Sequence, residues 1–238
     1  MTPENRIYDN LLALPLFLGM SRNDLQTAAG LARFDFRKEP AETLLAQAGT
    51  PCTHLFFLIE GEVSVRTAAD DDSYAIEETV SAPDIFQPER IFGLYQRFSR
   101  TYTTKSDCSL LCIPRQDILL LADKLDIFRI NLLNYISTLT QRCLLRSLRS
   151  PSGQTEGRIA QWVEQRCASA AGTKQVHIKM RRLAEELNES RMDISVALHR
   201  LQDRHLVSIH RGRFDIPLLE KLVYNGSKNE LVVRCLLN

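Results

Sequence analysis

The residues best suited to recognition chemistry lie between positions 180 and 204. A short segment with apolar residues on one side ends at Asn188 and Glu189. Ser190 can then cap a longer amphipathic helix, because a serine hydroxyl accepts from the free backbone N–H groups of a helix start. Two helices joined by so tight a turn are typical of a helix-turn-helix, whose second helix enters the major groove of DNA. The positions expected to pack inward are Leu183, Ala184, Leu187, Ile194, Ala197, Leu198 and Leu201.

The outward face of the second helix is mostly polar. Arg191, Ser195, His199 and Gln202 recur three or four positions apart, so they share one stripe with Ser190 at its start. Arginine can bind guanine through two hydrogen bonds, and a methionine such as Met192 could touch a thymine methyl group. An ordinary solvated face is the simpler interpretation. We favour DNA binding because cationic residues that suit phosphates flank this helix: Lys179, Arg181, Arg182, His210, Arg211 and Arg213.

The region before residue 115 indicates short strands. Residues 62–66 alternate polar and apolar side chains, as a half-buried strand does, and residues 49–51 and 70–73 are rich in turn formers. Several short strands at this spacing predict a small barrel or sandwich over residues 34–113. Before them, Ser21 is expected to cap a helix that ends at Leu31.

A long helix is predicted over residues 115–149. One apolar face contains Phe128, Leu132, Tyr135, Ile136, Leu139 and Cys143, which we take as the interface with the same helix of a second copy. A second apolar stripe contains Ile127, Ile130, Leu133, Leu144 and Leu148. The alternative is a helix buried within one subunit.

The clearest linker follows this helix at residues 150–153, Ser-Pro-Ser-Gly. Beyond it the pattern predicts a helix over 156–170, a strand over 175–178 and the two helices described above. A hairpin over 206–216 has Gly212 at its turn. Residues 1–149 carry 16 basic and 19 acidic side chains, whereas residues 150–238 carry 14 and 10. The basic second part favours a polyanionic partner.

The overall composition excludes several classes of protein. The chain has 238 residues, of which 44% are hydrophobic and 25% charged, and these values are those of a folded soluble protein rather than a disordered one. No apolar run approaches the ~20 residues of a membrane span, and the N-terminus lacks the pattern of a secretory signal. We therefore expect a cytoplasmic protein with no membrane partner.

The six cysteines do not form a ligand set for a metal. None is in a C-x-x-C pair, and Cys108 and Cys112 lie in an expected strand, about 13 Å apart. We predict reduced, mostly buried thiols and no metal site.

Four motifs together resemble a known family. They are Pro15-Leu16-Phe17 followed by Ser21 and Asp24-Leu25, the strand-turn-strand segment 54–65 around Gly61, Gly157-Arg158-Ile159-Ala160, and Ser190-Arg191. With the order of the elements, they resemble the CRP/FNR family of bacterial transcription regulators over nearly the whole chain. The resemblance implies an α+β fold: a β-roll or jelly-roll barrel like a cyclic nucleotide-binding domain (1–115), a dimerisation helix (116–149) and a winged helix-turn-helix domain (150–238).

The resemblance also implies partners. It implies a homodimer on an inverted-repeat site in double-stranded DNA, a small-molecule effector on the barrel, and RNA polymerase. Family members that bind cyclic nucleotides use a Gly-Glu-Leu segment and a later Arg-Ser or Arg-Thr pair. Glu89 and the Arg100-Thr101 pair match this pattern, but Pro88 and Arg90 replace the glycine and the leucine. Proline has no N–H to offer a phosphate, so a cyclic nucleotide site is doubtful.

The effector region is expected to use Glu89, Arg90, Arg97, Arg100 and Thr101 for an effector that the sequence does not identify. Salt bridges to nearby acids are the simpler interpretation of these arginines. The N-terminal cysteine cluster of FNR-like oxygen sensors is missing, since no cysteine precedes Cys52. Haem stays open as a cofactor, because Met20, Cys52 and His54 could be axial ligands. No cofactor is predicted.

The recognition helix also departs from the family. Met192 and Val196 stand where the family often has glutamate and arginine, so the family's DNA sequence cannot be carried over. Two other functions were weighed. One is a ligand-binding protein that does not bind DNA, and the other is a thiol enzyme that uses Cys52 and His54. Since no third catalytic group accompanies that pair, we predict that the protein is not an enzyme.

Overall fold

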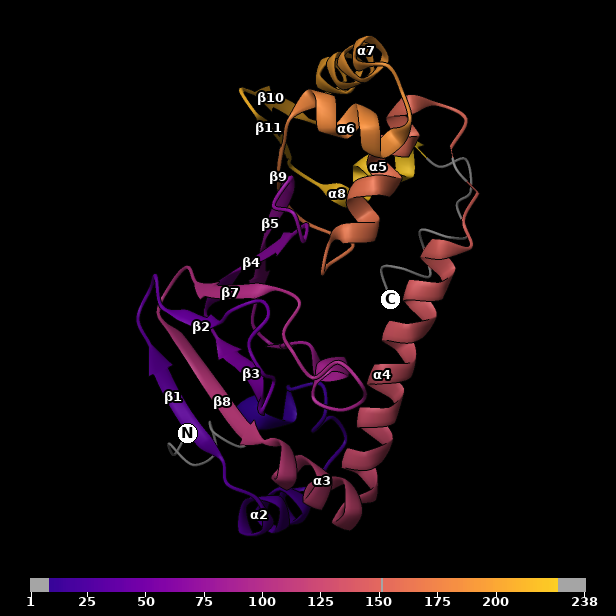
Figure 1. The fold of residues 1–238 in the computed structure, drawn as a ribbon. Helices are drawn as coiled ribbons and strands as arrows, with labels where there is room; N and C mark the ends of the chain where they lie inside the picture. The colour runs from indigo at the N-terminus through magenta and orange to yellow at the C-terminus, as the bar shows by residue number, and fades with distance from the viewer. Residues whose placement is uncertain (1–8, 151, 227–238) are drawn as a thin grey trace. The chain divides into compact units, whose positions relative to one another are not determined.

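The computed structural model describes residues 9–150 and 152–226, which form two compact units (Figure 1). The first unit contains the chain up to Val63 together with Val80–Gln141. The second contains Ser64–Thr79 together with the chain from Arg142 onward. The sixteen residues Ser64–Thr79, which come from the strand-rich half of the sequence, thus belong to the C-terminal unit. The domain boundaries expected from the sequence, at residues 115 and 149, do not include this assignment.

The first unit is built on antiparallel strands in a jelly-roll-like arrangement. One sheet has the order β1-β8-β3-β6, and β2 pairs with β7. Their bounds are β1 Asp35–Glu39, β2 Leu44–Ala46, β3 His54–Glu60, β6 Asp84–Ile85, β7 Thr101–Thr104 and β8 Cys108–Pro114. The predicted strand-rich barrel or sandwich is confirmed as an antiparallel, jelly-roll-like arrangement, and Cys108 and Cys112 both lie buried on β8.

Two local features fix this unit. Ser21 caps α2 (Arg22–Leu31) with a capping box, in which Asp24 N–H donates to its hydroxyl at 3.1 Å and the Ser21 N–H donates to the Asp24 carboxylate at 2.9 Å. Gly61, between β3 and β4, has a φ of +98°, and a Cβ there would lie 2.6 Å from the Asp107 carbonyl oxygen. Only glycine permits both the turn and the close approach.

The predicted single helix over 115–149 is wrong in one respect. The chain forms α3 (Arg115–Lys124) and α4 (Asp126–Ser147), separated by Leu125 in an extended conformation. Phe128, one turn into α4, is fully buried and packs its ring against Phe17 at 5.4 Å between centroids. Burial of Leu125 and Phe128 explains the break, because a continuous helix would aim these apolar side chains differently. No helix in the described ranges is long and apolar enough to cross a membrane.

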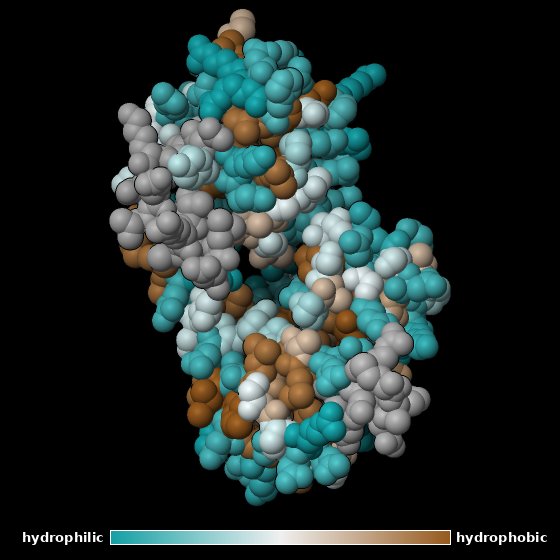
Figure 2. All heavy atoms as spheres, turned by 180° about the vertical axis from the view of Figure 1, so that it is seen from behind, coloured by the Kyte–Doolittle hydropathy of each residue, from teal (hydrophilic) through white to brown (hydrophobic). Residues whose placement is uncertain are grey.

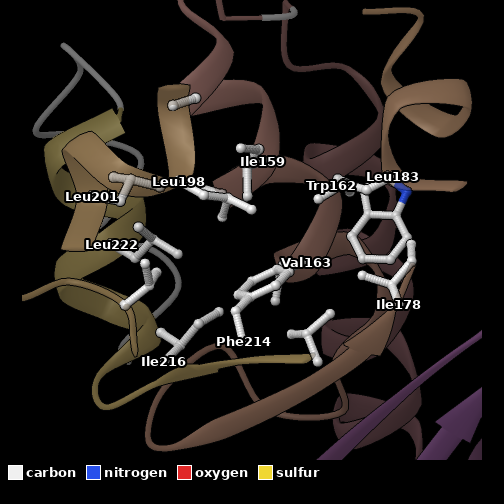
Figure 3. Packing of buried hydrophobic residues seen from close by; sticks show 14 of the residues in the cluster. Ile159, Trp162, Val163, Ile178, Leu183, Leu198, Leu201, Phe214, Ile216 and Leu222 are labelled. Carbon is white, nitrogen blue, oxygen red and sulfur yellow. The ribbon is translucent and has the colours of Figure 1, made fainter. Parts of the chain in front are cut away.

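The second unit combines helices with an antiparallel sheet in the order β10-β11-β9-β5-β4. The predicted helices and hairpin are present, and the first helix ends earlier than expected. The bounds are β4 Glu62–Ala68, β5 Tyr74–Ser81, α5 Thr155–Arg166, β9 Lys174–Ile178, α6 Met180–Leu187, α7 Arg191–Asp203, β10 Ser208–His210, β11 Arg213–Ile216 and α8 Leu219–Gly226. Its apolar core draws on α5, α7, α8 and the sheet, whose side chains converge in Figure 3.

A feature that we call the strand junction joins β5 to β9 in this sheet. The two strands pair antiparallel over five residues, with Glu78 opposite Lys174. Both of these side chains are fully buried, and Lys174 Nζ lies 2.5 Å from Glu78 Oε2. The same carboxylate accepts from the backbone N–H groups of Ala168 and Ser169. Because every partner comes from a distant part of the sequence, the junction is a product of tertiary folding.

Aromatic packing closes the other end of the junction. The Tyr74 ring meets the Trp162 ring edge-on at 4.9 Å between centroids, and Arg166 lies over Trp162 at 4.4 Å. Arg166 also donates to the Tyr74 hydroxyl at 3.0 Å and pairs with Glu186 at 2.9 Å. These contacts make β5 an integral part of the second unit.

Candidate functional site

The turn between α6 and α7 is built by local hydrogen bonds. Asn188 takes the left-handed conformation, with φ 50° and ψ 51°, and ends α6. The Glu189 N–H then donates to the Ala184 carbonyl at 3.0 Å. Ser190 caps α7, since its hydroxyl accepts from the Asp193 N–H at 3.0 Å and donates to the Asp193 carboxylate at 2.6 Å. Ser190 therefore has a structural role at the start of α7.

Arg158 on α5 binds the turn between α6 and α7. Its guanidinium pairs with Glu189 at 2.5 Å and also donates to the Leu187 carbonyl. The sequence placed Arg158 in a family-like motif but gave no sign of this role. These contacts attach the residues of the turn to α5, so Arg158 is a positioning residue.

The exposed side of α7 defines what we call the α7 surface: Arg191, Met192, Ser195, Val196 and His199. The Ser195 carbonyl accepts from Nδ1 of His199 at 2.7 Å. Since a carbonyl can only accept, Nδ1 carries a proton in this hydrogen bond, which leaves Nε2 as the ring nitrogen without this partner. In Figure 2 the end of the unit that carries α7 is mainly hydrophilic, with a few hydrophobic side chains at its tip.

The cations around this surface fall into two groups. Arg181 pairs with Glu185 at 3.1 Å, Arg182 with Glu186 at 2.7 Å, and Arg213 with Asp215 at 3.4 Å. His210 lies 3.1 Å from the same Asp215. Within the described ranges, Lys179, Arg191 and Arg211 have no such acidic partner. Figure 1 shows α6, α7 and the β10–β11 hairpin at the same end of the unit; Lys179 precedes α6, Arg191 begins α7 and Arg211 lies between β10 and β11.

Gln202 is better explained as a structural residue. Its side-chain oxygen accepts from the Ile209 N–H at 2.9 Å, which fastens the end of α7 to β10. Gln202 itself remains exposed, so this contact engages its side-chain oxygen at the surface of the unit.

The predicted effector residues lie around η1 (Pro88–Arg90) in the first unit. Arg97 donates to the Gly49 carbonyl at 2.7 Å, and the Thr101 hydroxyl accepts from the Ala48 N–H at 3.1 Å. Both residues thus hold the loop before β3. Glu89 is exposed, and Arg90 has a buried Nε with no hydrogen-bond partner among the described residues.

Gln87, which precedes η1, binds back into the unit. It has a φ of 41° and is buried, and its amide donates to the Ser99 hydroxyl at 2.5 Å and accepts from the Ser99 N–H at 3.0 Å. Beside it, Phe86 stacks on Tyr102 at 4.3 Å between centroids and Phe56 lies 6.1 Å from Phe86. Protein side chains fill the interior next to η1.

The family model of the cyclic nucleotide-binding domain matches residues 36–124. Residues 36–124 are therefore similar to a cyclic nucleotide-binding domain, and we use that name for them below. The match spans residues 54–65, one of the four motifs that resemble CRP/FNR regulators, and it confirms the resemblance for this part of the chain. No curated protein sequence matches the chain.

Similar solved structures include three bacterial regulators. The catabolite activator protein of Thermus thermophilus is 21% identical, with 90% of this chain and 100% of that chain covered and a TM-score of 0.49. DNR from Pseudomonas aeruginosa is 16% identical over 99% and 100% of the two chains, with a TM-score of 0.46. CLP from Xanthomonas campestris, described as responsive to c-di-GMP, is 16% identical over 83% and 99%, with a TM-score of 0.44.

Several groups around η1 that could hold a cyclic phosphate are already used within the protein. Pro88 begins η1 and offers no N–H, Arg97 and Thr101 are engaged by the loop before β3, and Gln87 occupies the Ser99 N–H. Arg90 Nε is the one buried donor that the described contacts leave over in this group.

Cys52 and His54, in the same domain, do not form a catalytic pair. The Cys52 thiol points to the His54 carbonyl at 3.8 Å, while His54 Nδ1 lies 2.9 Å from the Thr53 hydroxyl. Burial raises the pKa of Cys52 to about 11, so at neutral pH it is a protonated thiol and a poor nucleophile. The described cysteines Cys52, Cys108, Cys112, Cys143 and Cys167 are free, and Cys235 lies outside the described residues.

Helix α4 presents a different apolar face from the one predicted. Phe128 and Leu132 are buried within the first unit, and a side chain with so little exposed surface has none left to bury against a second copy. Tyr135, Ile136 and Leu139 are half-buried, and Cys143 is exposed. The exposed apolar residues are those of the other stripe, Ile127, Ile130, Leu133, Leu144 and Leu148, with Leu145. Brown side chains lie at intervals along the α4 side of Figure 2.

Proposed function

We propose that the protein is a homodimeric, sequence-specific DNA-binding transcription regulator, with α6 and α7 as a helix-turn-helix and the β10–β11 hairpin as its wing. The observation that carries the proposal is the set of three cations, Lys179, Arg191 and Arg211, that have no acidic partner in the described chain around the exposed start of α7. A protein that leaves arginine and lysine unpaired on one face can offer them to phosphates and base edges.

The three cations would have different roles. Lys179 precedes α6 and Arg211 lies in the hairpin turn, positions from which both would reach phosphates and fix the orientation of the unit. Arg191 is the first residue of α7, the part of a recognition helix that faces base edges, and would bind a guanine. Ser195 and His199 follow on the same face and would support it.

The exposed apolar stripe of α4 supports the dimer. Leu148 is 79% exposed, and Ile130, Leu133 and Leu144 are also exposed on this helix. A patch of this kind on a helix is typical of a surface that another protein covers. We propose a second copy, because two recognition helices must reach successive major grooves about 34 Å apart to read an inverted repeat. Leu133→Asp with Leu144→Asp should give monomers in sedimentation, and Leu119→Asp on α3 should stay dimeric.

The cyclic nucleotide-binding domain would sense an effector other than a cyclic nucleotide. An effector controls DNA binding only if it binds one arrangement of the protein better than another. RNA polymerase is a proposed partner through the family resemblance alone. No enzymatic role is proposed, because Cys52, the nucleophile considered from the sequence, is buried and protonated.

DNA binding is tested by selecting duplexes from a random-sequence pool and titrating the selected duplex at 50–200 mM salt. If Lys179 and Arg211 of both copies each neutralise one phosphate, log Kobs should fall with log salt with a slope of about −3.6 or steeper. Lys179→Gln should reduce the slope by roughly 2 in the dimer. Arg181→Gln, which removes a cation already paired with Glu185, is the matched control and should change it less. A pool that yields no enriched duplex would favour the ligand-binding protein that does not bind DNA.

A further inference from the structure

Two apolar side chains interrupt the polar face of α7. Met192 is 73% exposed and Val196 is 42% exposed, and they lie one turn apart between the cation at Arg191 and the imidazole of His199. Side chains at positions i and i+4 of a helix are neighbours, about 5–6 Å apart at Cβ. Together they form a small apolar strip within an otherwise hydrophilic surface.

The fold itself does not need this strip. The inner face of α7 is already complete, since Ile194, Ala197, Leu198 and Leu201 are buried in the core of the second unit. Valine is also a weaker helix former than the straight-chain polar residues that usually cover an exposed helix face. Neither local helix stability nor the core therefore explains the pair.

We propose that Met192 and Val196 contact the 5-methyl groups of thymines in the DNA site. The proposal rests on the proposed DNA binding and specifies which bases the surface reads. Thymine is the one standard base that presents a methyl group in the major groove, and apolar side chains are its natural contacts. Arg191 adjoins Met192 on α7, and Lys179 and Arg211 precede α6 and lie in the β10–β11 turn, all three without an acidic partner among the described residues; these cations favour a nucleic acid as the occupant of the strip.

The spacing limits where the thymines lie. Stacked bases on one strand are about 3.4 Å apart, so two side chains about 5–6 Å apart reach methyl groups within roughly two base steps. Arg191 is adjacent to Met192 and would bind guanine beside them. Each half-site is therefore expected to contain a guanine with two thymines close to it.

The experiment replaces single thymines by deoxyuridine in the duplex selected from the random pool. Uracil keeps every hydrogen-bonding group of thymine and lacks only the methyl group. Removing one buried methyl group should weaken binding by wild-type protein about fourfold, the equivalent of about 0.8 kcal/mol. Met192→Ala should bind the thymine and uracil forms equally at one position, and Val196→Ala at a second position within about two steps of it.

A matched control separates this effect from any loss of exposed apolar surface. Leu218, which precedes α8, is an exposed apolar residue of the second unit outside the strip. Leu218→Ala should keep the full loss of affinity that uracil causes at both positions. Circular dichroism of each variant checks that the unit stays folded.

The outcomes are distinct. If no duplex is enriched, both the proposed function and this inference fail. If duplexes are selected but uracil is tolerated at every thymine, DNA binding stands and the methyl contact is refuted. A uracil penalty that persists in Met192→Ala and Val196→Ala assigns the methyl contact to other residues, and this also overturns the inference. If the strip binds another protein instead of DNA, duplexes are still selected and uracil is tolerated at every thymine.

Discussion

The strand junction and the α7 surface lie in the same unit and use the same residue types in opposite ways. At the junction, Lys174 and Glu78 are fully buried and bind each other at 2.5 Å, and two backbone N–H groups share the carboxylate. At the α7 surface, Arg191 is exposed, and no acidic group among the described residues binds it. The difference teaches that the partners of a charged residue, rather than its type, decide whether it holds the fold or is free to bind a ligand.

The same difference separates the two sets of predicted ligand residues. Around η1, Arg97 and Thr101 are engaged within the cyclic nucleotide-binding domain, as the residues of the junction are in theirs. Arg191 and Arg211 differ from them, because both are exposed and have no acidic partner among the described residues. A set of arginines in a sequence therefore predicts an anion site only where the fold supplies no carboxylates or carbonyls to satisfy it.

The largest expected effect is at the junction. Glu78→Gln should lower the free energy of unfolding of the second unit by about 3–5 kcal/mol, because it leaves Lys174 buried without its charge partner. Urea unfolding followed by Trp162 fluorescence measures this directly, since Trp162 is the only tryptophan of the chain and is buried in that unit.

The neighbouring Glu77 provides a matched control on the same strand. Its carboxylate lies 3.9 Å from Arg66 and 4.0 Å from His177, and all three side chains are partly exposed. Glu77→Gln should therefore cost less than about 1 kcal/mol. Equal losses for Glu77→Gln and Glu78→Gln would remove the distinction between a buried and an exposed pair.

The second effect concerns DNA binding by the α7 surface. Arg191→Ala should weaken binding to the selected DNA by about 1–3 kcal/mol and relax the preference at one base pair. Its effect on unfolding should be small, because Arg191 has no partner in the described chain to lose. Arg200→Ala is the control on the same helix, where Arg200 is paired with Glu156 at 3.3 Å. The assignment is wrong if Arg191→Ala keeps the wild-type ratio of affinities for selected and scrambled duplexes.

The elements of the second unit could be predicted because their signals are local. The inner face of α7 and the cap at Ser190 fix a helix that was expected over 191–204 and is found at Arg191–Asp203. The division of the long helix at Leu125 could not be predicted from the apolar pattern alone. Burial of Phe128 against Phe17, a residue more than 100 positions earlier, decides it.

The candidate site divides in the same way. Arg191, Ser195 and His199 were predicted from their spacing; in the structure Arg191 and His199 are exposed and Ser195 is half-buried. Arg158 and the use of Gln202 by Ile209 were missed, because each depends on a contact between elements. The pairing of β5 with β9 was also missed, since nothing in either strand marks its partner.

The third effect concerns how the stability of the first unit depends on pH through its buried thiols. Burial raises the pKa of Cys52 and of Cys112 to about 11, above the value in an unfolded chain. The fold therefore favours the protonated thiol: this contribution to stability is complete below pH 9 and is lost as pH rises through 11. Cys52→Ala should reduce the loss of stability between pH 8 and pH 10 by about 1 kcal/mol. Urea unfolding followed by circular dichroism measures it, and Cys143→Ala, at an exposed position, should leave the loss unchanged.

The smallest expected effect is that of cyclic nucleotides on the cyclic nucleotide-binding domain. cAMP or cGMP at millimolar concentration should leave the melting temperature and the DNA affinity unchanged, because Pro88 offers no N–H group and the Thr101 hydroxyl and the Ser99 N–H are already engaged within the protein. The measurement is sensitive, since a ligand at 100 times its dissociation constant stabilises a protein by about 2.7 kcal/mol. A rise in melting temperature with cAMP that disappears in Arg90→Ala would show that the buried Nε of Arg90 is the remnant of a working site. The residues around η1 would then be ligand-binding residues, like those of the α7 surface, rather than residues that hold the fold, like those of the strand junction.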